Sequence, residues 1–163
     1  MATTRSGRPR PTVEARPSYA ELLRTVGALL DSAGSQLAVI ELTRRRVRVL
    51  AVGAFGEQEL TLRYLRHCIA AQRRLRGRLP PRDPLDLARL SPTLRAVGSE
   101  LDRQQRRAYR VVVTPGAVII TGSQGYRRLL AVDTLAALLR AALALRTHPA
   151  PEPPASAHPP DGG

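Results

Sequence analysis

Lysine is absent from this sequence of 163 residues, whereas arginine occurs 26 times. Without lysine, the chain has neither the lysine of a P-loop nor an amine side chain for Schiff-base chemistry. Arginine differs from lysine in its planar, forked guanidinium, which binds phosphate or carboxylate through two parallel hydrogen bonds. A GC-rich genome would also favour arginine codons. The excess of basic over acidic residues, a formal net charge of +13, therefore carries more information than the choice of base.

Aromatic and sulfur-containing side chains are also scarce. Tryptophan is absent, and Phe55 and Cys68 are the single phenylalanine and the single cysteine. One cysteine excludes an intramolecular disulfide, and the three scattered histidines show no metal-ligand spacing. We therefore expect an aliphatic core, no metal and no cofactor. The tyrosines near the basic part of the chain, Tyr64, Tyr109 and Tyr126, are too few for a series of base-stacking platforms.

No long apolar run is present either. The longest apolar stretch, around residues 135–145, contains Arg140 and is too short to span a bilayer. The first residues of the sequence are not apolar, which argues against a secretory signal. We expect a protein without membrane association that is located inside the cell, in the cytoplasm, or in the nucleus if the source is eukaryotic or viral.

The composition divides the chain into three parts. Residues 1–17 contain arginine and proline with few apolar residues, and residues 148–163 are rich in proline, alanine and glycine. Such segments bury too little apolar surface to offset the loss of chain entropy, so we expect a disordered basic arm and a disordered tail. Residues 18–147 remain, and they are enough for a single domain with one modest core.

The first half of this domain has three predicted elements. Ser18 followed by Glu21 is typical of a capping box, and it predicts a helix over 18–33. Two runs rich in β-branched residues, 37–42 and 47–52, predict a hairpin with an arginine-rich tip. A helix is expected over 57–77. It has one apolar side, formed by Leu60, Leu62, Leu65, Ile69 and Leu75.

The second half begins with a Pro-rich connection over 79–92. Ser91-Pro92 is a good helix start, and the helix expected from there to about Ala108 has a weak point at Gly98. Strands are then predicted at 109–113 and 117–120, joined by a Pro-Gly turn, with a third at 126–132. A final helix is expected to begin at Asp133 or Thr134. Its predicted buried stripe contains Leu135, Leu138, Leu139, Ala142 and Leu143.

These elements predict an α+β two-layer sandwich in which antiparallel hairpins pack against helices, in the order α-β-β-α-α-β-β-(β)-α. The order resembles that of the roadblock and longin folds, in which a helix, a hairpin, a helix, three strands and a helix follow one another. Residues 79–108 depart from that order. A strand-turn-strand-helix unit occurs twice, near 37–77 and 109–146, which suggests an internal duplication that the residues themselves support weakly.

The basic residues are concentrated in the middle of the chain. The span from Arg44 to Arg110 has 17 arginines against six acidic residues, a net charge of +11. A concentrated basic surface attracts the phosphate backbone of nucleic acids. We therefore predict a non-enzymatic protein that binds DNA or RNA without strong sequence specificity. The predicted contacts are on the hairpin tip and the following helix: Arg44, Arg45, Arg46, Arg48, Arg63, Arg66, Arg73, Arg74, Arg76 and Arg78.

A role in protein assembly is the alternative. Small α+β domains often pair through edge strands or helices, and arginine is enriched at interfaces. This interpretation predicts an acidic protein partner or a homodimer, with the roadblock-like order of elements as support. A charged helix face, however, is most often simply solvated.

Catalysis is the least supported interpretation. His67 and Cys68 are neighbours in a predicted helix and therefore do not face each other. Gly122-Ser123-Gln124-Gly125 is not followed by lysine, and Asp133 is explained by a helix cap. We expect no catalytic residues.

Overall fold

The computed structural model describes residues 16–76, 88–131, 133–138 and 140. Both predicted disordered ends lie wholly or almost wholly outside these ranges, as does most of the Pro-rich connection. Along the described chain follow α1 (Tyr19–Ser32), β1 (Ala38–Leu42), β2 (Arg46–Ala51), β3 (Glu57–Thr61), α2 (Leu62–Arg76), α3 (Leu90–Arg103), β4 (Ala108–Thr114), β5 (Ala117–Gly122) and β6 (Arg127–Ala131). Residues 133–138 are also helical.

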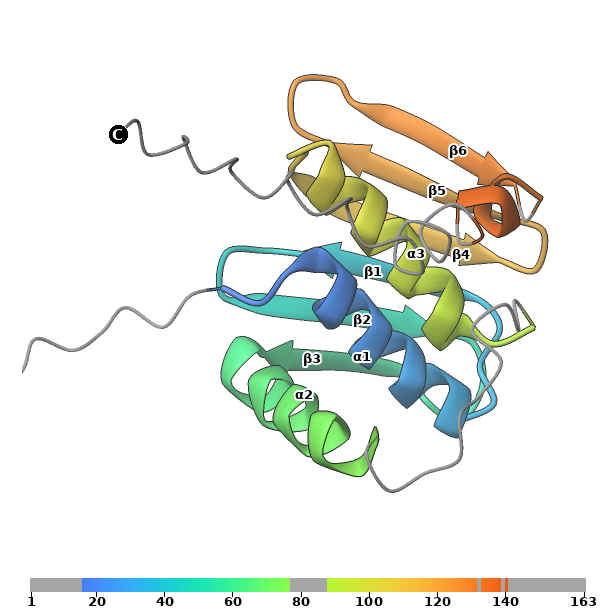
Figure 1. Cartoon of the computed structure of the whole chain (residues 1–163). Helices are drawn as coiled ribbons and strands as arrows, with labels where there is room; N and C mark the ends of the chain where they lie inside the picture. Colours follow the sequence, from blue (N-terminus) through green and yellow to red (C-terminus); the bar gives the residue numbers. More distant parts are fainter. Residues whose placement is uncertain (1–15, 77–87, 132, 139, 141–163) are drawn as a thin grey trace, which may run out of the picture.

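The six strands form one antiparallel sheet in the order β3-β2-β1-β4-β5-β6. The described helices lie on one side of it (Figure 1). Alternate strand residues, such as Ile40, Val49 and Ile120, point to this side and are fully buried. Their intervening neighbours are half-buried or exposed. The molecule is therefore an α+β sandwich of one helical layer and one sheet, and the predicted fold class is confirmed.

The prediction of a helix over 57–77 is wrong for its first five residues, which form the edge strand β3. The five residues of β3 contain a single leucine, so their local pattern does not indicate a strand. Their pairing comes from residues distant in sequence, since Arg46 bonds Glu59 and Arg48 bonds Glu57 across the β2–β3 ladder. Such pairs of opposite charge stabilise neighbouring strands. The helical pattern is correct from Leu62 onward.

The other boundaries shift by less. The third strand predicted at 126–132 is confirmed as β6, and Leu135 of the final helix is fully buried. The last three residues of the predicted stripe lie outside the described residues. Helix α3 begins at Leu90 and ends at Arg103, earlier than predicted, since Gln105 adopts a left-handed φ of 52°.

The two halves of the sheet repeat with an offset of 71 residues. The β1–β2 pairs Leu42–Val47 and Ile40–Val49 become the β4–β5 pairs Val113–Val118 and Val111–Ile120. The helices share this offset, because the pattern Leu-Arg-x-Val-Gly-x-x-Leu-Asp begins at Leu23 in α1 and again at Leu94 in α3. The weakly indicated duplication is thus a repeat of helix and three strands in the described structure.

The α1–α3 crossing joins the two halves. A Cβ on Gly27 would lie 2.7 Å from the backbone of Ser91, and one on Gly98 would lie 2.4 Å from the backbone of Tyr19. Gly98, predicted as a weak point, is therefore required by the close approach of two backbones.

Each of these helices also caps the other. Asp31, near the end of α1, accepts hydrogen bonds from the first two backbone N–H groups of α3, at 2.7 and 3.0 Å. Asp102, near the end of α3, accepts from the first two N–H groups of α1, both at 3.0 Å. Four N–H groups that a helix leaves without internal partners are thereby satisfied, with negative charge at the positive end of each helix dipole.

Candidate functional site

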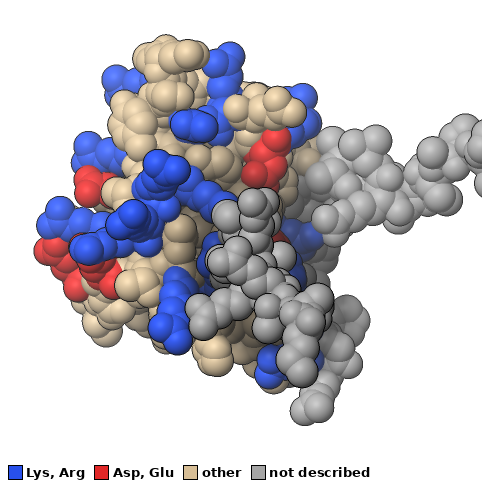
Figure 2. Space-filling model, turned by 90° about the vertical axis from the view of Figure 1, so that its left-hand side faces the viewer, with Lys and Arg blue, Asp and Glu red and all other residues tan. Residues whose placement is uncertain are grey.

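The predicted nucleic-acid contacts form three groups in the structure. Arg44 and Arg45 lie in the turn between β1 and β2, where both are exposed. Figure 2 views the side of the molecule that carries this turn and shows basic side chains spread over it, with acidic side chains among them. Among the described residues, neither Arg44 nor Arg45 forms an ion pair with a carboxylate, so this turn is the least neutralised part of the predicted surface.

The second group contains predicted contacts that are already bound to carboxylates. Arg46 pairs with Glu59, Arg48 with Glu57 and Glu41, and Arg73 of α2 with Glu21 of α1. The hydrogen bond to Glu57 is the main cause of a raised pKa of Arg48. These three guanidiniums connect elements of the fold, and a phosphate would have to compete with the carboxylates that they already contact.

The third group lies on α2. Arg63 and Arg74 are exposed, whereas Arg66 is half-buried and has a partner within the chain. Arg76 ends the helix, and Arg78 lies outside the described residues. The ten predicted contacts therefore do not form one continuous free surface, and the concentration of charge in the sequence overstates the charge available to an anion.

The sequence interpretation missed the outer face of the sheet, opposite the helices. In the register of the six strands, one row of outward residues crosses the whole sheet and is apolar in five of its six positions. From β3 to β6 the row reads Glu57, Leu50, Val39, Val112, Ile119 and Leu129. We call these residues the apolar row.

Exposed leucine and valine side chains gather on this face. Leu50 is 53% exposed and Leu129 is 67% exposed, and both belong to the apolar row. Leu37 and Val52 continue the outward alternation of β1 and β2, and they are joined by a hydrogen bond from the Val52 N–H to the Leu37 carbonyl. Scattered apolar side chains are normal on a protein surface, but a contiguous set of them is typical of an interaction site.

A second row runs beside the apolar row and carries charge. From β3 to β6 it reads Glu59, Arg48, Glu41, Arg110, Thr121 and Arg127. We call these residues the charged row. Its acidic members lie on β1 and β3, whereas the part on β4 to β6 has two arginines and no acid. The charge of the outer face thus changes across the sheet, from acidic and basic residues together on β1 to β3 to basic residues alone on β4 to β6.

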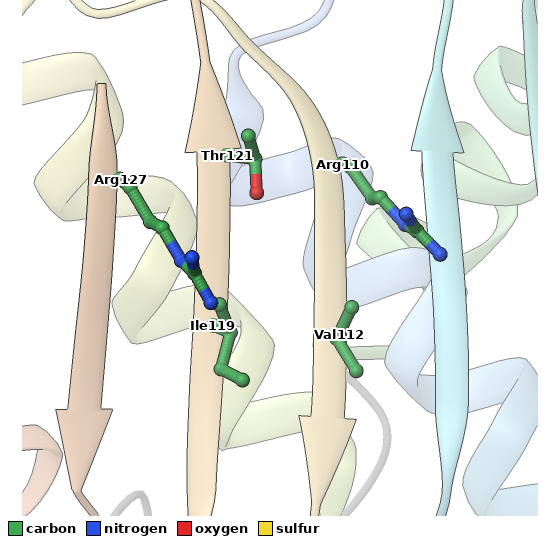
Figure 3. Close-up of a pocket in the computed structure, with 5 residues that line it drawn as sticks. All are labelled: Arg110, Val112, Ile119, Thr121 and Arg127. Atoms are coloured by element: carbon green, nitrogen blue, oxygen red, sulfur yellow. The ribbon is translucent and has the colours of Figure 1, made fainter. Parts of the chain in front are cut away.

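A shallow depression lies on the basic half of this face. It is lined by Arg110 and Val112 of β4, Ile119 and Thr121 of β5, and Arg127 of β6 (Figure 3). The figure shows both guanidiniums on the same side of the sheet as the apolar side chains. The Arg127 guanidinium extends toward Ile119, whereas that of Arg110 extends away from Arg127 toward β1 (Figure 3). Acidic groups would meet two separate fork-shaped donors here, beside an apolar floor.

The helical side of the second half contains a buried carboxylate. Glu100 of α3 bonds to Arg103 at 2.7 and 2.8 Å and to Arg128 of β6 at 2.9 Å. These donors, Arg103 first, lower the pKa of Glu100 to about 2 despite its burial. The same contact raises the pKa values of Arg103 and Arg128. All of these groups are satisfied within the fold, so the cluster links α3 to the sheet and is not an open site.

The remaining groups that could take part in chemistry are dispersed. Cys68 is half-buried in α2, and its interaction with Tyr64 raises the pKa of that phenol. Within the described ranges, no three His, Cys, Asp or Glu side chains come together as metal ligands. None of the helices in the same ranges has the length and hydropathy of a membrane span.

Comparison with protein-family models, with curated proteins and with solved structures finds no match to this chain. The resemblance to roadblock and longin folds therefore has no support from a solved structure. The extra strand β3 between the first hairpin and α2 is a further departure from that order of elements. The functional argument rests on the geometry of the outer face and of the β1–β2 turn.

Proposed function

We propose that this chain is a non-enzymatic protein-binding module whose partner covers the outer face of the sheet. The observation that carries this proposal is the apolar row, which runs from Leu50 to Leu129 through Val39, Val112 and Ile119. Burying such a row against a partner would contribute roughly 25 cal/mol of favourable binding free energy for each Å² of apolar surface removed from water. The flanking charged row would give the contact its orientation and its selectivity.

The chemistry of the face also indicates what kind of partner suits it. The half formed by β4 to β6 presents Arg110 and Arg127 beside Ile119 and Val112. A partner with acidic side chains next to apolar ones would match this half. The half formed by β1 to β3 presents three carboxylates and two arginines, so it suits a partner surface with a basic excess.

Site-specific photo-crosslinking tests the proposal. A photoreactive residue in place of Leu50 or Leu129, in cells that naturally express the protein, should give defined crosslinked products. The matched control is Leu75, which is 51% exposed on α2 and lies away from the outer face. Equal crosslinking at Leu75, or none at the two sheet positions, would contradict a docking function of this face.

Binding to the phosphate backbone of nucleic acid is the second candidate. It is favoured by Arg44 and Arg45, which are exposed in the β1–β2 turn and form no ion pair among the described residues, and by the exposed Arg63 and Arg74 on α2. The Arg46, Arg48 and Arg73 ion pairs reduce the number of free cations on the predicted surface, so we place this function second.

Fluorescence anisotropy with duplex and single-stranded probes tests the second candidate. Changing Arg44 and Arg45 to glutamine should weaken binding and make its salt dependence shallower by about two phosphate contacts. Arg46→Gln is the control, because that side chain is paired with Glu59. If no probe binds at low salt, or if the double variant binds as the natural chain does, this candidate is lost.

A further inference from the structure

We infer that the partner on the outer face is a second copy of this chain, packed sheet to sheet about a two-fold axis that runs along the strands between β1 and β4. The inference rests on the proposed function and names the occupant of that same face. The argument comes from the register of the sheet, from its charge pattern and from its size.

The register decides which strands would meet. The sheet order β3-β2-β1-β4-β5-β6 has its midpoint between β1 and β4. An axis through that midpoint and along the strands lays β1 on the partner's β4, β2 on its β5 and β3 on its β6. This rotation does not change the position of a residue along the strand direction, so a row that runs across the strands is laid on the same row of the second copy. The apolar row therefore lies on the apolar row of the second copy, and the charged row lies on the charged row.

In the charged row, opposite charges then meet at two of the three positions. Glu59 of β3 faces Arg127 of β6 in the second copy, and Glu41 of β1 faces Arg110 of β4. Arg48 faces Thr121, so neither copy places like charges opposite each other in this row. In the apolar row, Leu50 faces Ile119 and Val39 faces Val112, and at the edge Glu57 faces Leu129. Each contact occurs twice, as an isologous interface requires.

The other two-fold axis in the plane of the face runs across the strands. It lays each strand on its own copy, so that β4 and β6, which carry Arg110 and Arg127 and no acid, face themselves. At any level of this axis, the basic half lies on the basic half of the second copy, without the carboxylates of β1 to β3 opposite it, and this arrangement costs free energy. The charge pattern thus selects the axis along the strands. Packed sheets are usually rotated by about 30° because of their twist, which preserves the contacts near the centre of the face best.

The size of the face is also appropriate. Six strands at about 4.8 Å spacing span about 24 Å, and strands of five residues at about 3.3 Å per residue are about 17 Å long. This rectangle has a flat area of about 400 Å² per copy, and the relief of its side chains raises the accessible area above that value, toward the roughly 800 Å² per partner of a standard interface. Two such faces enclose a two-sheet core with a helical layer on each outside.

Sedimentation velocity of the full chain over a range of concentrations tests the inference. We expect a dimer that persists in 1 M salt, because the apolar row contributes most of the contact. Leu50→Lys should raise the dimer dissociation constant about 100-fold, since the substitution acts twice in a symmetric interface. Leu75→Lys, an equally exposed position on α2, should leave it unchanged. A dimer that is insensitive to Leu50→Lys uses another surface and overturns the inference.

Charge reversal tests the choice of axis. Arg127→Glu alone should weaken the dimer roughly tenfold by placing like charges opposite each other. Glu59→Arg alone should weaken it at least as much, because it also breaks the Arg46–Glu59 ion pair within the chain. The chain with both substitutions should recover dimerisation, because the pair is restored with its signs exchanged. Weakening by both single variants without recovery in the double variant overturns the arrangement about this axis.

The failure of this inference can be told apart from the failure of the proposed function. If the chain stays monomeric at about 0.5 mM but is crosslinked at position 50 to a different protein, the second copy is excluded and the docking function stands. If the chain is monomeric and position 50 gives no product, both are rejected.

Discussion

The two halves of the molecule have the same skeleton and different surfaces. In both, a helix with the Leu-Arg-x-Val-Gly-x-x-Leu-Asp pattern precedes three antiparallel strands, and 71 residues separate equivalent positions. Yet the outer face of the first half has three carboxylates among its charges, whereas that of the second half has arginines alone. The residues that the fold needs, in the helix pattern and the buried strand positions, are repeated in both halves. The residues proposed for recognition, on the outer face, differ between them.

The polar interactions under the sheet also differ between the halves. Glu100 in α3 gathers Arg103 and Arg128, but the equivalent position in α1 is Leu29. In the first half, an ion pair between Glu21 and Arg73 joins α1 to α2 at the surface. Each half is therefore fastened by its own charge network around a shared apolar frame.

The largest predicted effect concerns what the halves share. Leucine in place of Gly27 or Gly98 should lower the free energy of unfolding by about 3 kcal/mol or more, because the new Cβ would overlap backbone atoms that cannot move independently. Chemical denaturation of each variant measures this. Gly116→Ala is the control, since a Cβ there meets nothing within 4 Å. A loss at one glycine alone would show that the crossing is not equally close from both sides.

Among the described residues, the buried carboxylate of Glu100 is present in the second half alone, and it should make the stability of the protein depend on pH. The pKa of Glu100 is lowered from 4.5 to about 2, so its contribution is complete above pH 4.5 and is lost as the pH falls towards 2. The shift corresponds to roughly 3 kcal/mol of folding stability. Glu100→Gln should remove this part of the acid sensitivity, as measured by denaturation between pH 7 and pH 2.

A smaller effect is expected at the reciprocal caps. Asp31→Ala and Asp102→Ala should each lower stability by about 1–2 kcal/mol, because each leaves two backbone N–H groups of the opposite helix without their acceptor. Thermal and chemical unfolding of the two variants would compare the caps directly. Strongly unequal losses would mean that one half depends on its partner more than the other does.

The smallest effect compares the ends of the two helices. Gly34 after α1 and Gln105 after α3 are equivalent positions, with φ of 67° and 52°. Gln105→Gly should raise stability by up to about 1 kcal/mol, and Gly34→Gln should lower it by a similar amount, since a side chain disfavours this backbone region. Melting temperatures that move in opposite directions would confirm the prediction. Shifts of the same sign would refute it.

Local patterns in the sequence were sufficient for most of the fold. The capping box at Ser18, the Pro-Gly turn and the β-branched runs identified α1 and four of the strands. The edge strand β3 was missed because its pairing comes from Arg46 and Arg48 on a neighbouring strand. Gly98 was misread because the second backbone that approaches it belongs to a helix about 70 residues away.

The outer face could not be recognised before the strand order was known. The alternation of Leu50 and Val39 with buried residues does not reveal which side of the sheet the helices cover. The arginine-rich tip at Arg44 and Arg45 was located correctly, but the sequence alone did not show that Arg46, Arg48 and Arg73 had carboxylate partners. The repeated motif in α1 and α3 was visible in the sequence and would have indicated the duplication.

The α1–α3 crossing has a consequence for the history of the chain. Gly27 and Asp31 approach the first residues of α3, and Gly98 and Asp102 approach the first residues of α1, so each half gives the other the same contacts that it receives. Such reciprocal contacts are those of a symmetric homodimer, but here both halves belong to one polypeptide. A gene for half the length could specify the same architecture from two identical chains. With both copies on one polypeptide, each half can carry its own charges.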